Sequence, residues 1–224
     1  SQRGYRRPLA RMSPAETTES VLLPYRVWAV VSPFNFPSAL AAGMIAGALL
    51  AGNTVVFKPA LDAPVSGELL CEALWAAGVP RDALQLVHGP GSRVGEALLA
   101  DQRIAGVAFT GSSEVGMRIV RRAAEGTVAG PCPVVVEMGG KNAAIVTATA
   151  DLDAAAEAVA RSAFGFGGQK CSACSGVYVE RSVAQPFLDR LVQRTEAMQV
   201  GDPAAGDPAL GPVIRAGAVQ SFRK

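Results

Sequence analysis

The feature that most constrains the fold is a regular alternation of strand and helix patterns from residue 25 onward. Apolar, largely β-branched runs at residues 25–32, 54–57, 84–87, 106–109 and 134–136 are separated by segments with helical spacing. Parallel strands need helical crossovers, and this alternation is typical of right-handed βαβ units. The sequence therefore predicts an α/β protein with a mostly parallel sheet covered on both faces.

Helices are expected between these strands at residues 38–51, 64–77, 92–100 and 113–124. The second of them has Pro64 in its first turn and Gly78 just past its end, which are the usual start and stop signals.

The pattern changes after residue 140. A short apolar run at 143–146 is followed by an alanine-rich helix that Asp151 caps and that ends near Phe164. We expect next a strand at 177–179, a helix at 183–198 and a Gly-, Pro- and Asp-rich loop at 201–212. We expect a lead-in segment over 1–20, a first α/β domain over 21–140 and the beginning of a second α/β domain over 141–224.

Composition narrows the function classes. Twenty-one basic and 19 acidic residues give a net charge of +2, which offers no reason to expect nucleic acid as a partner. The longest apolar run, 39–51, is shorter than the roughly 20 residues that span a bilayer, so no membrane partner is expected. A single histidine, His88, makes a metal centre or a histidine-based triad unexpected. The four cysteines fit a reduced cytoplasmic protein, with a mitochondrial matrix left open.

The strongest local signal is the segment Gly167-Gly168-Gln169-Lys170-Cys171-Ser172-Ala173-Cys174. A cysteine that follows a glycine-rich loop, next to a lysine, is placed to act as a thiolate nucleophile. A buried structural cysteine explains the pattern equally well, and Cys171 with Cys174 also has the spacing of a redox pair. The motif alone leaves these alternatives open.

Two further motifs follow predicted strands. Thr110-Gly111-Ser112 runs from a strand into a helix, where free backbone amides can bind phosphate, although helix capping alone explains such residues. Asn35, within Pro33-Phe34-Asn35-Phe36-Pro37, is an amide donor suited to an oxyanion, although an ordinary Asx turn explains it too. The Gly-x-Gly-x-x-Gly fingerprint of ordinary dinucleotide-binding folds is absent.

Two charged residues stand at other strand ends, where ligands of open parallel sheets gather. Lys58 ends the second strand and Glu137 follows the fifth. Each could equally be a solvated surface residue.

Taken together and in order, these motifs resemble the aldehyde dehydrogenase family from about residue 25 to residue 214. The segment from Ser162 to Ser175 most resembles the 1-pyrroline-5-carboxylate dehydrogenase branch, which oxidises glutamate γ-semialdehyde to glutamate. The motifs that carry the resemblance are Pro33-Phe34-Asn35-Phe36-Pro37, Gly52-Asn53-Thr54-Val55-Val56-Phe57-Lys58-Pro59, Phe109-Thr110-Gly111-Ser112, Glu137-Met138-Gly139-Gly140-Lys141 and Gly168-Gln169-Lys170-Cys171.

The resemblance implies a role for each motif. Cys171 is the expected nucleophile, Asn35 and the Cys171 backbone N–H the expected oxyanion donors, and Glu137 the expected general base. It also implies NAD as cofactor, with domain 21–140 as the NAD(P)-binding domain. Leu61, where many relatives carry Glu or Ser, leaves the choice between NAD and NADP open. The expected cofactor-binding residues are Ser32, Pro33, Phe34, Lys58, Gly111, Ser112 and Gly116.

Members of the family are considerably longer than this chain. The resemblance therefore implies that the chain is an internal fragment, that residues 141–224 are the start of a truncated catalytic domain, and that the isolated fragment is inactive. The full-length protein is expected to be a homo-oligomer that takes a small-molecule aldehyde. Three alternatives remain: a dehydrogenase for succinate semialdehyde or aliphatic aldehydes, a non-catalytic nucleotide-binding module, and a thiol redox protein. Cys174 is expected to have a packing role only.

Overall fold

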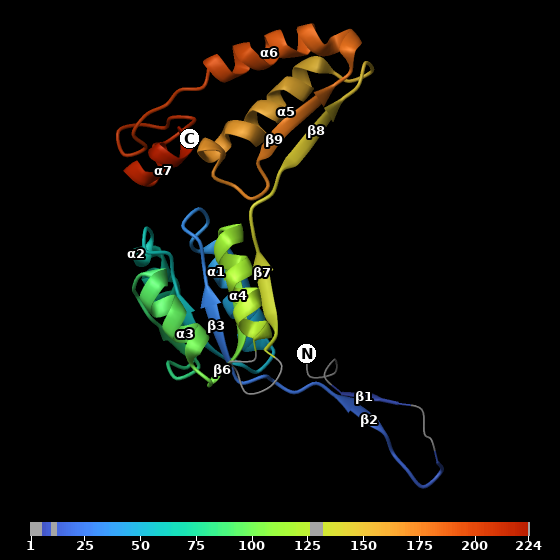
Figure 1. Cartoon of the computed structure of the whole chain (residues 1–224), viewed down its shortest axis with the longest axis vertical. Coiled ribbons are helices and arrows are strands. Elements are labelled where there is room, and N and C mark those ends of the chain that lie inside the picture. Colours follow the sequence, from blue (N-terminus) through green and yellow to red (C-terminus); the bar gives the residue numbers. More distant parts are fainter. Residues whose placement is uncertain (1–5, 10–12, 126–131, 224) are drawn as a thin grey trace. The chain divides into compact units, whose positions relative to one another are not determined.

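The computed structural model describes residues 6–9, 13–125 and 132–223. The chain forms two compact units, Ser1–Glu137 and Met138–Lys224 (Figure 1). The sequence predicted a boundary after residue 140, and the division lies between Glu137 and Met138. The functional roles expected for the two parts stay predictions.

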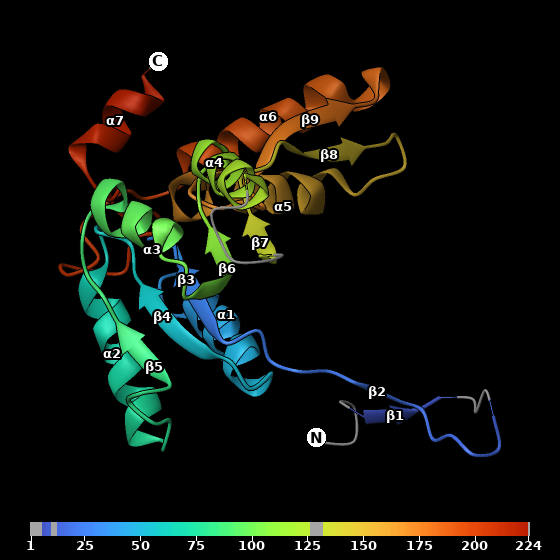
Figure 2. The same ribbon diagram turned by 60° about the horizontal axis from the view of Figure 1, so that its bottom comes forward.

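The first unit is built on a five-stranded parallel sheet with the strand order β5-β4-β3-β6-β7 (Figures 1 and 2). The chain runs outward from β3 to β5 and then resumes on the other side of β3, so that β3 and β6 flank a topological switch point. The predicted parallel α/β fold is confirmed. The elements of the sheet layer and its helices are β3 (Val27–Val31), α1 (Ala39–Leu50), β4 (Thr54–Lys58), α2 (Pro64–Ala76), β5 (Leu84–Leu86), α3 (Glu96–Ala100), β6 (Ile104–Thr110), α4 (Ser113–Ala124) and β7 (Val134–Glu137).

Two apolar clusters cover the two faces of this sheet. Val30 and Phe57 pack with Ile45 of α1 on one face. Ala29 and Phe109 pack with residues of α4 on the other. Ala29 and Val30, which are neighbours in β3, thus pack into clusters on opposite faces, because successive side chains of a strand point to opposite faces of the sheet. This double burial explains why the strands read as continuous apolar runs.

The central strand is shorter than the predicted run 25–32. Arg26 has a φ of 101°, outside the extended region. The side-chain oxygen of Asn53 accepts hydrogen bonds from the N–H groups of Tyr25 (2.7 Å) and Arg26 (3.1 Å). Because Asn53 holds these two amides, β3 begins at Val27.

Two other expectations were incomplete. The helix predicted over 92–100 is regular only in its second half, because a π-helical turn, Gly91–Gly95, precedes α3. The glycines at both ends of that turn weaken α-helix formation there. A short antiparallel pair, β1 (Arg6–Pro8) with β2 (Glu19–Val21), was not predicted; it begins in the lead-in segment and extends one residue past it.

The described residues of the second unit form a parallel pair of strands and three α-helices. Its core gathers Val146, Ala156, Val159 and Phe187. The helix α7 was not predicted, whereas the loop expected at 201–212 contains no helix or strand. The elements are β8 (Asn142–Val146), α5 (Leu152–Phe164), β9 (Cys174–Val179), α6 (Ala184–Glu196) and α7 (Ala216–Phe222).

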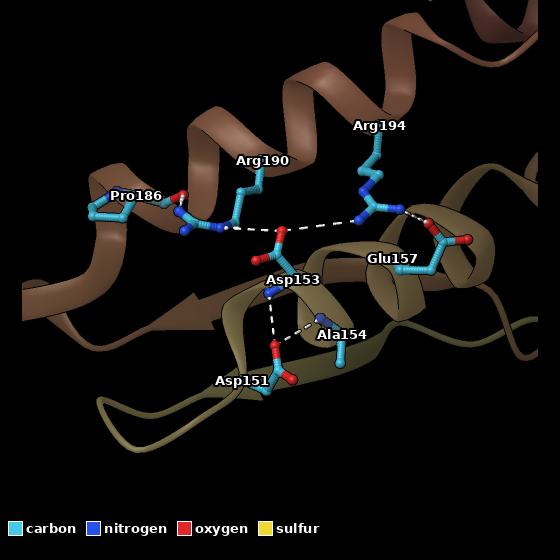
Figure 3. Close-up of polar contacts among 7 residues, drawn as sticks. All are labelled: Asp151, Asp153, Ala154, Glu157, Pro186, Arg190 and Arg194. Atoms are coloured by element: carbon cyan, nitrogen blue, oxygen red, sulfur yellow. Dashed lines mark hydrogen bonds and ion pairs between the residues drawn. The ribbon is translucent and has the colours of Figure 1, made fainter.

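Polar contacts mark the start of α5 and its contact with α6 (Figure 3). The Asp151 carboxylate accepts hydrogen bonds from the N–H groups of Asp153 (3.0 Å) and Ala154 (3.1 Å), which confirms the predicted cap. Arg194 of α6 pairs with Glu157 of α5 at 2.7 Å. Exposed ion pairs of this kind contribute about 0.2–1 kcal/mol each, so apolar packing holds the two helices together.

No helix within the three described ranges is long and apolar enough to cross a membrane.

The core of the first unit depends on Phe57, whose side chain is fully buried between the sheet and its helices. Phe57→Ala should lower the free energy of unfolding by about 3–5 kcal/mol through lost burial and the cavity left behind. The matched control Phe222→Ala, at a side chain 91% exposed, should change it by less than about 0.5 kcal/mol. Urea unfolding measures both, and equal losses would contradict the assigned core.

Candidate active site

The carboxyl edge of the five-stranded sheet gathers several of the predicted site residues. The register pairs Val31 of β3 with Lys58 of β4 and with Phe109 of β6. One step further on, Thr110 of β6 pairs with Glu137 of β7. Because all four strands run in the same direction, their ends and the residues after them lie along one edge.

Lys58 is buried at this edge. The residue is 4% exposed, and its Nζ donates a hydrogen bond to the carbonyl of Pro59 at 2.9 Å. Burial lowers the pKa of the Lys58 ammonium because the charged form loses hydration. The alternative of a solvated surface lysine is therefore wrong.

Ser32 is buried next to Lys58. Its N–H donates to the Lys58 carbonyl at 3.2 Å, extending the β3–β4 ladder by one residue. Its hydroxyl is buried and has no hydrogen-bond partner among the residues that the structure describes. An unsatisfied buried hydroxyl costs about 1–3 kcal/mol, so this atom is suited to a group that the protein itself does not supply. Pro33, Phe34 and Asn35 follow in the loop to α1 and are half-buried.

The turn after β6 begins α4. The Ser112 hydroxyl accepts a hydrogen bond from the N–H of Val115 at 3.4 Å and caps the helix. Gly111 is required by packing, because a Cβ there would lie 2.5 Å from the Phe109 ring. Gly116 is buried in α4. The capping role is thus confirmed, and phosphate binding at this helix start stays a prediction.

These residues fit a dinucleotide. The buried Ser32 hydroxyl can serve a ribose hydroxyl, and the Lys58 ammonium can donate hydrogen bonds to oxygen atoms. The first turn of α4 presents backbone N–H groups suited to phosphate. No group of three or more His, Cys, Asp or Glu residues in the described ranges could hold a metal ion.

The thiol loop, which we define as residues 165–174, lies in the second unit. After α5 the chain passes through three consecutive left-handed residues: Phe166 (φ 59°), Gly167 (φ 62°) and Gly168 (φ 69°). The N–H of Gln169 and its side-chain amide both donate to the Phe166 carbonyl. Glycine adopts this backbone conformation at little steric cost, which explains the two glycines before the cysteine.

Cys171 occupies a tight turn within the thiol loop. The N–H of Ala173 donates to the Lys170 carbonyl at 3.2 Å and closes the turn. Cys171 is exposed, so it is not a buried structural cysteine. Its backbone N–H meets no acceptor among residues 132–223 or the rest of the described chain.

Cys174 differs from Cys171 in its surroundings. It is half-buried, packs against the core of the second unit, and directs its thiol to the Gly176 carbonyl at 3.3 Å. Both cysteines are free thiols. Cys174 packs as predicted, and the absence of any further role stays a prediction.

One residue of this region escaped sequence reasoning. Asn142, at the start of β8, donates hydrogen bonds from its side-chain amide to the carbonyls of Cys171 (2.8 Å) and Ala173 (3.2 Å). The only signal in the sequence is its place directly after Glu137-Met138-Gly139-Gly140-Lys141. Glu137 itself ends the first unit and Cys171 belongs to the second, and their joint action stays a prediction.

Comparison with known proteins defines the class. Residues 3–224 match the aldehyde dehydrogenase family, and the chain belongs to that family. The resemblance that the motifs indicated is thereby confirmed.

Particular relatives narrow the comparison. A 1-pyrroline-5-carboxylate dehydrogenase of Geobacillus thermodenitrificans is 44% identical over 208 residues, which are 92% of this chain and 40% of the relative. The solved structure of 1-pyrroline-5-carboxylate dehydrogenase from Thermus with bound NAD has a TM-score of 0.92 and 41% identity, over 98% of this chain and 43% of that one. The solved structure of proline utilization A from Bdellovibrio bacteriovorus has a TM-score of 0.90 and 37% identity, over 99% of this chain and 24% of that one. The chain thus spans about two fifths of the length of the curated relatives it matches.

The cysteines should differ in reactivity. Cys71 is fully buried, and burial raises the pKa of its thiol to about 11, so near pH 8 it is both protonated and covered. Cys171 is exposed. Iodoacetamide should therefore label Cys171 well before Cys71, as followed by peptide mass spectrometry, and unfolding should remove the difference. Labelling of Cys71 first would contradict the site as described.

Proposed function

We propose that this chain carries the dinucleotide-binding domain and the nucleophile of an NAD-dependent dehydrogenase that oxidises glutamate γ-semialdehyde to glutamate in proline degradation. Its main support is the 44% identity over 208 residues to a 1-pyrroline-5-carboxylate dehydrogenase. The semialdehyde is the open-chain form of the compound in that name. The proposal includes a homo-oligomeric enzyme in the cytoplasm.

Cys171 would begin the reaction. Its thiolate sulfur attacks the aldehyde carbon, a C–S bond forms, and the carbonyl electron pair moves onto oxygen. The Asn35 amide and the Cys171 N–H would donate hydrogen bonds to that oxygen. The exposed thiol and the N–H that has no acceptor within the described chain support this role.

The edge of the first unit would hold the cofactor. NAD, when bound, supplies the acceptor for the hydride. The thiohemiacetal carbon on Cys171 gives up that hydride, its C=O bond re-forms, and a thioester to Cys171 is left. Ser32 and Lys58 would bind its hydroxyl groups, Pro33 and Phe34 would line its nicotinamide side, and Gly111, Ser112 and Gly116 would place the start of α4 at the phosphates. The solved Thermus relative with bound NAD supports this cofactor, and Leu61 leaves NADP open.

Glu137 would complete the reaction as general base. It takes a proton from water, whose oxygen bonds to the carbonyl carbon of the cysteine thioester while the C–S bond breaks. The carboxylic acid leaves and the Cys171 thiolate is restored. The position of Glu137 at the carboxyl end of β7 supports this role.

The direct test is NADH formation by the complete reading frame that contains this chain. Glutamate γ-semialdehyde, succinate semialdehyde and a simple aliphatic aldehyde are compared as substrates. We expect a clear preference for the first. Cys171→Ser should lower kcat by at least about a thousandfold, because the nucleophile is lost. The matched control Cys174→Ser should retain activity.

The outcomes separate the parts of the proposal. Preference for another aldehyde would keep the mechanism and contradict the substrate. Activity that survives Cys171→Ser would contradict the mechanism. NAD binding without turnover of any aldehyde would favour a non-catalytic nucleotide-binding module.

Lys58 offers a separate test of the cofactor site. Lys58→Met keeps the apolar stem and removes the ammonium, so the Kd for NAD should rise by roughly tenfold, about 1.4 kcal/mol. The lowered pKa means that the folded state holds the Lys58 proton less tightly than the unfolded chain does. Charging this group therefore opposes folding at neutral pH, and the substitution should not lower the free energy of unfolding.

Titration calorimetry and urea unfolding measure these two effects. The control is Lys141→Met, at an exposed lysine. A Kd unchanged by Lys58→Met, or raised equally by both substitutions, would contradict the assigned site.

A further inference from the structure

The side chain of Asn142 bridges two carbonyl groups of the thiol loop. Its Nδ2 donates to the Cys171 carbonyl at 2.8 Å and to the Ala173 carbonyl at 3.2 Å. A primary amide nitrogen carries two hydrogens, so both donors are used. The two carbonyls lie on either side of Ser172, and one side chain therefore constrains the backbone directly after the nucleophile.

This bridge completes a turn that a single backbone bond would hold loosely. The turn runs from Lys170 to Ala173 and is closed by one hydrogen bond of 3.2 Å. Cys171 is exposed, so few packing contacts restrain it. Asn142 is the first residue of β8, so its side chain ties the turn to the parallel ladder of β8 with β9.

Gly140 provides the space for the bridge. A Cβ at this position would lie 3.3 Å from both the Cys171 carbonyl oxygen and the Asn142 Nδ2. Contacts of that length would displace one partner or the other. Glycine at position 140 therefore leaves room for the turn to lie against Asn142.

We propose that Asn142 is a positioning residue that holds the Cys171 backbone so that its N–H is directed at the oxyanion formed on the substrate. This inference rests on the proposed role of Cys171 as nucleophile. Asn142 touches no reacting atom and acts through the carbonyls of Cys171 and Ala173. Its loss should affect reactions that pass through an oxyanion more than reactions that do not.

Two reagents separate these cases on the protein expressed from the complete reading frame, without cofactor. With p-nitrophenyl acetate, the Cys171 sulfur bonds to the carbonyl carbon, an oxyanion forms and collapses, and p-nitrophenolate leaves to give an S-acetyl thioester. With iodoacetamide, sulfur displaces iodide in one step and no oxyanion forms. The ratio of the two rate constants at Cys171, measured by peptide mass spectrometry, therefore reports on the N–H donor.

Asn142→Ala should lower the acylation rate at Cys171 by roughly tenfold, less than the roughly hundredfold or more that is lost when an oxyanion donor itself is removed. The alkylation rate should change by less than about twofold. The matched control Gln185→Ala removes a side-chain amide hydrogen bond elsewhere in the same unit and should leave both rates unchanged. Asn142→Ser, which retains one donor, should recover part of the acylation rate.

Other results would overturn the proposal. An unchanged ratio in Asn142→Ala would do so, and so would an equal fall of both rates, which indicates a merely structural role. If thermal melting shows that Asn142→Ala does not fold, Asn142→Ser decides: its ratio should fall about threefold, and an unchanged ratio overturns the inference. Cys132 is a half-buried free cysteine, and burial raises the pKa of its thiol. Wild-type Cys171 that is not acylated ahead of Cys132 would contradict the proposed function and the positioning role together.

Discussion

The parallel pairing of β3 with β4 and β6 is the constraint on which the first unit depends. Parallel strands all end at one edge, and the register places Lys58 and Phe109 beside Val31 there. The residues after each strand consequently share an edge although they lie far apart in the sequence. Burial of both faces supplies the stability that allows a buried ammonium and an unsatisfied hydroxyl at that edge.

The thiol loop is organised by local backbone chemistry rather than by burial. Three left-handed residues reverse the chain after α5, and the turn at Lys170–Ala173 presents Cys171 to solvent. Asn142 and Gly140 then serve one purpose, since the amide holds the turn and the glycine leaves room for it. The segment Glu137-Met138-Gly139-Gly140-Lys141 therefore does more than carry a carboxylate. It also leads into Asn142, whose side-chain amide holds the turn around Cys171.

Most strands and helices could be predicted from the sequence because the signals for them are local. The spacing of apolar residues and the positions of proline and glycine indicated the strands and helices of the first unit, and Asp151 indicated the start of α5. The start of β3 at Val27 could not be predicted, because it depends on hydrogen bonds from Tyr25 and Arg26 to Asn53, which lies 28 and 27 residues further along the chain. The burial of Lys58 depends likewise on packing at the sheet edge. The role of Asn142 could not be predicted from its place after the motif 137–141, since its hydrogen-bond partners lie 29 and 31 residues away.

In the proposed reaction, Cys171 forms a covalent intermediate that Glu137 helps to release. The most direct measurement is the mass of the Cys171 peptide after Glu137→Gln enzyme, expressed from the complete reading frame, is mixed with glutamate γ-semialdehyde and NAD. Without the base, the account predicts that a glutamyl thioester accumulates on Cys171 and that hydroxylamine removes it. An unmodified Cys171, or an adduct on Cys174 instead, would contradict the account.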